Sequence, residues 1–437
     1  MTKLNLKNLH QISPAHGLSK EDLSSKSNLI PKYLKKIHAR EQGFYTVIDN
    51  QQTIDDIKTY AKNVEGKYND IVVLAIGGSS LGTICLQQSL THIFQNELRV
   101  PSSKFQVPKL HVLDNIDPCL IKEIQDIIEL PKTLFIVVTK SGGTPETLSE
   151  YFYFRSLTDH AGLDAKEHFV FITDPEKGLL RKIASEQNIP TFEVPPSVGG
   201  RFSVQTAVGL LPAALIGIDI DSLISGLQSM RDKFLSENLE ENLPFQIATM
   251  QYELNKKGKT MNVIMPYSQR LIRFADWYRQ LLAESIGKAQ NEAGQTVNVG
   301  ITPINALGAT DQHSQSQLYN EGPNDKFFML IRVNDFGINL PIPNLHPTEE
   351  AVNYIKDTSF EELINIELQA TAESYTQNDR PNITIEIEKV DAKTLGQLFM
   401  LFEGATAFLG EYFCINAFNQ PGVELAKINT KKLLLAK

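Results

Sequence analysis

Two stretches of the sequence, far apart along the chain, each place a long cation close to glycine. Gly199-Gly200-Arg201-Phe202-Ser203 lies near the middle, and Gln420-Pro421-Gly422-Val423-Glu424 leads to Lys427 near the end. An arginine keeps its proton, so it can stabilise a developing oxyanion without joining the proton transfer. Arg201 is therefore a candidate for stabilising an anionic intermediate. Taken alone, however, a Gly-Gly-Arg turn is more often an ordinary surface feature.

A carboxylate that could act as the base stands on a predicted helix. Trp277, Gln280 and Glu284 are spaced so that they share one face of that helix. Beside a tryptophan and near the C-terminal end of a helix, a carboxylate is desolvated and feels the negative end of the dipole. Both effects raise its affinity for a proton, which suits a general base near neutral pH. The alternative is a solvent-facing glutamate paired with Lys288 one turn on.

A glycine-rich turn, Gly77-Gly78-Ser79-Ser80-Leu81-Gly82, follows directly after an apolar run. Glycine allows a sharp turn and a close approach to a ligand, and the amides at a helix start face an anion. Three interpretations compete. The turn is a near miss for the dinucleotide fingerprint, it matches the nucleophile elbow of serine hydrolases with Ser80 as nucleophile, or it cradles a sugar phosphate. A purely structural turn is the fourth possibility.

A second polar turn, Thr139-Lys140-Ser141-Gly142-Gly143-Thr144-Pro145-Glu146, also follows an apolar run. Thr144 suits a helix N-cap and Pro145 the first helical position. The hydroxyls of Thr139, Ser141 and Thr144 could converge on a phosphate, helped by exposed amides and the helix dipole. The Gly-Lys pair of a Walker loop is missing. A capped structural turn and an anion site are about equally supported by these residues.

His313 lies in a polar stretch, Gly308-Ala309-Thr310-Asp311-Gln312-His313. A histidine there could move a proton, although a lone histidine in a polar stretch is usually a surface residue. No His-Glu-x-x-His or paired metal-ligand spacing occurs, so we expect no metal and no cofactor.

The elements that must position these residues are apolar runs separated by helix-length segments. Near-continuous apolar strands of this kind are typical of a parallel sheet covered on both faces. We expect strands at residues 71–76, 110–113, 133–138, 169–172, 191–194, 263–267 and 327–333, and a strand with one exposed face through Ile383, Ile385 and Ile387. We expect a buried helix at 207–218 and helices at 398–413 and 425–435.

Length and composition favour a multidomain globular protein. The chain has 437 residues, 42% of them hydrophobic, and a net charge of -9, which argues against a nucleic-acid or anionic-membrane partner. The 12-residue apolar run at 207–218 is shorter than the ~20 residues that a membrane span needs. The start of the chain lacks an apolar signal region, and the three cysteines are far apart, so we expect a reducing, cytoplasmic location.

The order of the motifs resembles that of the glucose-6-phosphate isomerase (phosphoglucose isomerase) family. The series runs Gly-Gly-Ser, Thr-Lys-Ser…Thr-x-Glu-Thr, Gly-Gly-Arg-Phe-Ser, Glu-Ser-x-Gly-Lys, Gln-His and Gln-x-Gly-Val-Glu-x-x-Lys, from about residue 71 to 427. The third and the last segments are highly specific. The length is similar to that of the shorter bacterial form.

The resemblance implies an α/β fold: two doubly wound parallel-sheet sugar-isomerase (SIS) domains with flanking helices and a C-terminal helical arm. The boundaries that we expect are a helical segment at 1–45, SIS domains at 46–235 and 245–395, and an arm at 396–437. The implied activity is the metal-independent interconversion of glucose 6-phosphate and fructose 6-phosphate through an enediol(ate), in glycolysis and gluconeogenesis.

The resemblance also implies roles for individual residues. Glu284 is the base, Arg201 stabilises the negative intermediate, and Lys427 with His313 assists opening of the sugar ring. The phosphate is held by Thr139, Ser141 and Thr144 with the Lys140 amide, and the pocket is lined by Gly78, Ser79, Gln280 and Gln420, with Glu146 close by. In this family the histidine comes from the neighbouring subunit, so a homodimer is implied. A sugar-phosphate sensor on the same fold is the alternative, and it would need only the phosphate loop.

Overall fold

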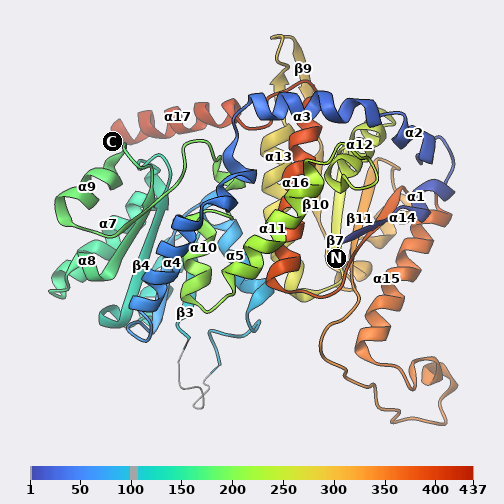
Figure 1. Ribbon diagram of the computed structural model, residues 1–437. Helices are drawn as coiled ribbons and strands as arrows, with labels where there is room; N and C mark the ends of the chain where they lie inside the picture. The colour runs from blue at the N-terminus through green and yellow to red at the C-terminus, as the bar shows by residue number, and fades with distance from the viewer. Residues whose placement is uncertain (1, 99–106, 437) are drawn as a thin grey trace. The chain divides into compact units, whose positions relative to one another are not determined.

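The computed structural model describes residues 2–98 and 107–436 of the chain (Figure 1). Its contacts divide into two compact units. We call the one that comprises residues 41–229 and 391–397 the Arg201 unit, and the one that comprises 1–40, 230–390 and 398–437 the Glu284 unit. Helices α11 (Ile220–Phe234) and α16 (Ala392–Tyr412) each run from one unit into the other. The domain boundaries expected from the sequence stay a prediction.

The Arg201 unit is built on a five-stranded sheet in which every pair is parallel, in the order β3-β2-β4-β5-β6. The strands are β2 (Asp70–Leu74), β3 (Lys109–Leu113), β4 (Thr133–Thr139), β5 (Phe169–Thr173) and β6 (Thr191–Glu193). These confirm the strands predicted from the apolar runs, with ends that differ by two residues at most. Because the strands are parallel, the loops after β2 and β4 leave the same edge of the sheet.

Helices cover this sheet. They are α4 (Gln51–Asn63), α5 (Leu81–Leu90), α6 (Pro118–Ile127), α7 (Pro145–His160), α8 (Ala165–His168), α9 (Leu179–Gln187) and α10 (Ala207–Leu215). On one face, Val72 and Phe135 pack in a core with Tyr151 and Phe154 of α7. On the other, Ile71 lies beside residues of α4 and α10. Burial on both faces explains why the strands read as unbroken apolar runs.

The Glu284 unit has a second five-stranded sheet, in the order β1-β12-β11-β7-β10. The strands are β1 (Lys3–Asn5), β7 (Met261–Pro266), β10 (Thr302–Asn305), β11 (Lys326–Val333) and β12 (Asn382–Ile387). Only the β1–β12 pair is antiparallel. Two sheets of mostly parallel strands between helices confirm the predicted α/β fold class.

The expectation that β12 has one exposed face is wrong. Asn382 and Thr384, the polar residues of its alternating pattern, are buried. The Asn382 side chain accepts a hydrogen bond from Asn8 of α1 (Lys7–Gln11) and donates to the Thr376 hydroxyl and the Arg380 carbonyl. The N-terminal segment therefore covers this face of β12, and the polar side chains satisfy one another there.

The central strand β7 separates two layers of the Glu284 unit. Val263 and Met265 lie in a core with Tyr375 of α15 (Phe360–Gln377). On the opposite face, Asn262 accepts a hydrogen bond from Gln251 of α12 (Leu243–Lys256), which also donates to Tyr278 of α13 (Ile272–Ile286). Further elements are α2 (Lys20–Ser24), α3 (Ile30–Ala39), α14 (Ser316–Glu321) and a hairpin of β8 (Lys288–Gln290) and β9 (Thr296–Val299). The chain closes with α17 (Glu424–Leu435), whose residues are all exposed.

Within the described residues, no helix has the length and apolar character needed to cross a bilayer.

Candidate active site

The polar turn after β4 brings its hydroxyl groups together. Thr139 ends the strand, and Thr144 takes the N-cap position of α7 with Pro145 behind it, as predicted. The Thr144 hydroxyl bonds to the Thr139 hydroxyl at 2.8 Å, and the Ser141 hydroxyl lies 3.3 Å from Thr139 and 3.5 Å from Thr144. Three hydroxyls thus meet at the start of a 16-residue helix, where the dipole favours an anion. We call residues 139–144 the phosphate loop, after the role that the resemblance implies for them.

The side chain of Lys140 makes contacts that were not predicted from the sequence, which assigned a role only to the Lys140 amide. Its Nζ donates to the carbonyls of Pro196 at 2.7 Å and Val198 at 2.8 Å. Partial burial lowers the pKa of Lys140, and the nearby Asp174 carboxylate opposes that shift. The ammonium therefore links the phosphate loop to the segment that leads into Gly199 and Arg201.

The glycine-rich turn after β2 forms a short 3-10 helix, η4 (Gly77–Ser79), in contact with η6 (Gly200–Phe202). A Cβ built on Gly78 would lie 2.4 Å from the carbonyl carbon of Gly200 and 2.6 Å from the amide nitrogen of Arg201. Only glycine permits so close an approach of two backbones. Gly78 therefore positions the Arg201 backbone, which is a more specific role than the lining role that the resemblance implies.

Ser203 links the two turns, whereas Ser80 bonds only within its own turn. The Ser203 hydroxyl donates to the Gly200 carbonyl at 2.6 Å and to the Gly78 carbonyl at 3.4 Å. Ser203 belongs to the Gly-Gly-Arg-Phe-Ser motif, and that membership is the signal by which it could have been found. Ser80 is fully buried and donates to the Gly77 carbonyl. A buried hydroxyl that bonds within its own turn is not placed to attack a substrate, so the hydrolase alternative loses its nucleophile.

Arg201 is 3% exposed, and its guanidinium carbon lies 5.4 Å from the centre of the Phe202 ring. Burial of the cation strengthens its field, because the effective dielectric constant is lower there than in water. Arg201 is therefore not the exposed arginine that a Gly-Gly-Arg turn usually carries. Ser79, at the end of η4, is partly exposed beside this contact.

In the Glu284 unit, α13 places Gln280 and Glu284 one turn apart. The Gln280 amide donates to Glu284 Oε1 at 3.1 Å, and Trp277 on the same face is buried. Lys288 donates its ammonium hydrogens to the main-chain carbonyls of Glu284 and Ser285, both at 2.8 Å. It therefore caps the C-terminal end of α13 through backbone carbonyls. The carboxylate itself is partly exposed and is oriented by Gln280.

The other predicted residues of the Glu284 unit are at its surface. His313 is exposed at the end of η8 (Thr310–His313), a turn braced by Asp311, whose carboxylate accepts from the Leu307 amide and the Ser314 hydroxyl. Lys427 is exposed on α17 and forms an ion pair with Glu424 at 2.8 Å. Gln420 immediately precedes η10 (Pro421–Val423), which leads into α17.

Glu146 lies in the first turn of α7, and Glu150 follows one turn later. Glu150 is only 2% exposed. Burial raises its pKa to about 8, and the negative charges of Asp114 and Glu146 add to the effect. The folded protein therefore holds a proton that the unfolded chain releases above the ordinary carboxyl pKa of 4.5.

The protonation difference at Glu150 should make the stability of the protein depend on pH. Between about pH 4.5 and 8, Glu150 binds a proton in the folded protein but loses it in the unfolded chain. Glu150 therefore makes the free energy of unfolding fall as the pH rises. Glu150→Gln removes that slope. We expect the thermal midpoint of Glu150→Gln, relative to the unchanged protein, to be higher at pH 8 than at pH 5. The exposed Glu123→Gln is the control, and an equal shift of Glu150→Gln at both pH values would contradict the assignment.

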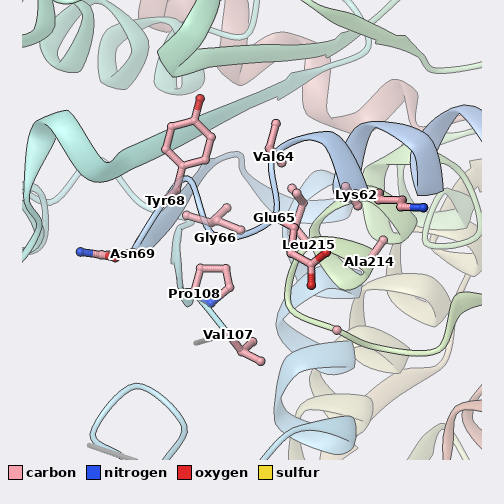
Figure 2. A pocket seen from close by; sticks show the side chains of 13 residues that line it. Lys62, Val64, Glu65, Gly66, Tyr68, Asn69, Val107, Pro108, Ala214 and Leu215 are labelled. Carbon is pink, nitrogen blue, oxygen red and sulfur yellow. The ribbon is translucent and has the colours of Figure 1, made fainter. Parts of the chain in front are cut away.

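Two cavities of the Arg201 unit lie away from these residues. One, of about 460 Å³, is at the other end of β2, between the C-terminal ends of α4 and α10 (Figure 2). Its walls include Glu65, Tyr68, Pro108 and Leu215, which Figure 2 labels. The other, of about 620 Å³, lies beside α4 and β6. None of the predicted site residues lines either cavity, so neither is a candidate for the chemistry. The described residues contain no cluster of three or more metal-ligating side chains.

The chain matches the family model described as phosphoglucose isomerase over residues 40–436. A glucose-6-phosphate isomerase of Carboxydothermus hydrogenoformans is 44% identical over 386 residues, which are 88% of this chain and 82% of that protein. A glucose-6-phosphate isomerase of Thermus thermophilus is 35% identical over 393 residues, 90% of each chain.

Solved structures agree with these matches. A hypothetical protein from Thermus thermophilus has a TM-score of 0.88 and 33% identity, with 99% of this chain and 100% of that one covered. A glucose-6-phosphate isomerase from Chlamydia trachomatis, at 21% identity, shares the fold with a TM-score of 0.82 over 96% of this chain and 87% of that one. Because the family model spans nearly the whole chain and the relatives exceed 30% identity over most of their length, the chain belongs to the phosphoglucose isomerase family.

Proposed function

We propose that the protein interconverts glucose 6-phosphate and fructose 6-phosphate by moving a proton between C2 and C1 through an enediol(ate), without a metal. The observation that carries this proposal is the convergence of the Thr139, Ser141 and Thr144 hydroxyls at the start of α7, in a chain of this family. We place the activity in glycolysis and gluconeogenesis, and the protein in the cytoplasm where those pathways run.

The phosphate group of the substrate binds at the phosphate loop. The hydroxyls can each donate to a phosphate oxygen, and the amides at the start of α7 add further donors. Lys140 directs its ammonium to backbone carbonyls, so the loop keeps its shape without placing that cation on the phosphate. A site made of hydroxyls and amides holds the phosphate as an anchor, and the reaction takes place at the other end of the sugar.

Glu284 removes the carbon-bound proton. The Gln280 amide holds its carboxylate in one orientation through the 3.1 Å hydrogen bond, which reduces the freedom that a base must lose in the transition state. The same carboxyl group then returns the proton to the neighbouring carbon, because C1 and C2 are adjacent. A positioned base of this kind contributes roughly 10²–10⁴-fold to the rate.

Arg201 stabilises the negative charge that appears on oxygen when the proton leaves carbon. Its near-complete burial and its contact with the Gly78 turn fix the cation before the reaction begins. A preorganised donor of this type contributes more than one that must reorient during the reaction.

Lys427 and His313 assist opening of the sugar ring, a step that needs proton transfer at the ring oxygen and at the C1 hydroxyl. For Lys427→Ala we expect a larger loss of turnover with ring-closed glucose 6-phosphate than with an open-chain substrate, because the open-chain form bypasses the step. The ratio of kcat/KM for the two forms measures this. The exposed Lys431→Ala on the same helix is the control, and equal losses for both substrate forms with Lys427→Ala would contradict the role.

A homodimer in which His313 serves the neighbouring subunit completes the proposal, and the exposed position of His313 is compatible with it. Two inactive variants should then restore one another. In a hybrid of Glu284→Gln and His313→Asn subunits, one of the two sites has both an intact base and an intact histidine. Random mixing should recover about a quarter of the unchanged activity, since half of the dimers are hybrids. If the purified variants recover nothing after dissociation and remixing, His313 acts within its own chain.

The proposed function is tested by a coupled assay that converts fructose 6-phosphate to glucose 6-phosphate in excess EDTA and detects the product by NADP reduction. We expect full activity with and without the chelator. Loss of activity that a metal restores would contradict the metal-independent mechanism. Folded protein that binds sugar phosphate but turns over neither isomer would instead be a sensor.

A further inference from the structure

The segment after the neighbouring strand β5 lies directly behind the phosphate loop. Thr173, the last residue of β5, pairs in register with Thr139, the last residue of β4. Its side chain is fully buried, and its hydroxyl donates to the Thr139 carbonyl at 2.8 Å. The Thr139 carbonyl belongs to the peptide that begins the phosphate loop. A buried hydroxyl of β5 therefore fixes the orientation of the loop at its first residue.

A second contact acts at the middle of the loop. Gly142 and Gly178 both have left-handed backbones, with φ of 62° and 97°. A Cβ on Gly178 would lie 2.8 Å from the Ser141 carbonyl oxygen and 3.0 Å from the Gly142 Cα. In the reverse direction, a Cβ on Gly142 would lie 2.9 Å from the Gly178 Cα. The two backbones thus touch with no side chain between them, and each requires glycine for space as well as for conformation.

The segment between these contacts is itself braced. The Asp174 carboxylate accepts hydrogen bonds from the Glu176 and Lys177 amides, both at 2.9 Å, and these bonds lower its pKa. Arg181 of α9 donates from Nε to the Asp174 carbonyl and from Nη1 to the Thr191 hydroxyl of β6, again at 2.9 Å. This turn should hold a fixed position against the phosphate loop, because a shift of the turn would break several hydrogen bonds at once.

We propose that residues 173–178 are a positioning element of the phosphate site, in which the Thr173 hydroxyl and the bare backbone of Gly178 hold Thr139, Ser141 and Gly142 in the phosphate-binding arrangement. This rests on the proposed function only in taking the phosphate loop as the place where the phosphate group binds. Thr173 and Gly178 touch the loop and need not touch the substrate. They should therefore affect affinity for the phosphate group and leave the proton transfer unchanged.

The first test compares two substitutions of Thr173 that differ in one group. Thr173→Val keeps the shape and loses the hydroxyl, whereas Thr173→Ser keeps the hydroxyl. For Thr173→Val we expect KM for fructose 6-phosphate and the dissociation constant of inorganic phosphate to rise together by about 2- to 12-fold, the range of one buried hydrogen bond. We expect kcat to stay within about twofold. Thr173→Ser should restore both constants.

The second test uses two glycines with the same backbone but different surroundings. Gly162, at the turn after α7, has φ of 69° and nothing within 4 Å of a Cβ built on it. Gly178→Ala and Gly162→Ala therefore share the strain of an L-residue at positive φ, and only Gly178→Ala pushes on the loop. We expect weakened phosphate binding for Gly178→Ala alone, although both variants lose thermal stability.

The proposal is overturned if Thr173→Val and Gly178→Ala lower the thermal midpoint but bind inorganic phosphate as the unchanged protein does. It is also overturned if the unchanged protein does not bind inorganic phosphate, since the loop would then not be a phosphate site. Calorimetric binding of inorganic phosphate needs no turnover. Failure of the isomerase assay with intact phosphate binding would therefore contradict the proposed reaction and leave the positioning role supported by these variants.

Discussion

Replacement of Glu284 by glutamine should lower kcat by roughly 10²–10⁴-fold, because the amide cannot accept the carbon-bound proton. Glutamine has the shape of glutamate and can keep the contact with Gln280, so the substitution removes the base with little change in packing. Because the phosphate loop belongs to the Arg201 unit, we expect the affinity for inorganic phosphate to remain unchanged. Steady-state kinetics in both directions and calorimetry measure these two effects.

The chain offers a closely matched control for this substitution. On α15, Gln369 donates to Glu373 at 2.9 Å with the same one-turn spacing, and Glu373 is exposed. Glu373→Gln therefore repeats the same chemical change in the same local contact at a position with no assigned role. It should leave kcat as it is. Near-normal turnover in Glu284→Gln would remove Glu284 as the base, whatever the control does.

Substitution of Arg201 should have the second largest effect. Arg201→Met removes the cation from a buried position, and loss of one preorganised oxyanion donor costs about 10²–10³ in kcat. Arg201→Lys retains a positive charge but loses the planar guanidinium, so its kcat should fall between those of the methionine variant and the unchanged protein. KM should change less than kcat, because the interaction strengthens as the enediolate forms.

Arg155→Met is the control for loss of an arginine in the same unit. Arg155 of α7 bonds to Tyr151 and Asp159 of the same helix and to Gln187 of α9, so its loss should change stability without changing turnover. If Arg201→Met and Arg155→Met have the same kcat after correction for the folded fraction, Arg201 is a structural residue. A loss in Arg201→Met that appears only in KM would assign it to substrate binding instead.

The strands of the Arg201 unit could be predicted from the sequence because burial on both faces leaves an unbroken apolar signal. Val137 and Phe171, for example, pack in the core on one face of the sheet, and their neighbours along the strand are equally apolar. β1 was not predicted, and β12 was predicted as a strand but with the wrong exposure. β1 has only three residues, two of them polar, and Asn382 of β12 can be buried because Asn8 and Thr376 satisfy its side chain.

The residue types of the phosphate loop supported an anion site and a capped structural turn about equally, and only the resemblance to the family favoured the anion site. A threonine at the end of a strand, a serine and a capping threonine before proline are each common, and the order of the motifs along the whole chain was the informative feature. Lys140 was assigned only by its amide, since no local pattern shows that its ammonium reaches the carbonyls of Pro196 and Val198. Contacts between distant segments depend on the folded topology, and sequence spacing does not encode them.

The glycines illustrate the same limit. Gly78 lies in η4, a turn that the sequence marked as a possible ligand site, whereas Gly178 precedes α9 in a stretch that the sequence analysis did not single out. Their roles follow from the backbone that each one faces, which is Gly200 for Gly78 and Ser141 for Gly178. A motif can indicate that glycine is needed, but only the fold shows which segment approaches it.

The most direct test of the account is isomerisation in D2O with EDTA present, followed by NMR of the hexose phosphates. Proton transfer through an enediolate exposes the abstracted proton to exchange on the carboxyl group, so deuterium should accumulate at C1 of fructose 6-phosphate and C2 of glucose 6-phosphate. Glu284→Gln should incorporate deuterium at least about 10²-fold more slowly. Deuterium incorporation by Glu284→Gln that is as rapid as in the unchanged protein would contradict the account, because the proton would then leave carbon without the Glu284 carboxylate.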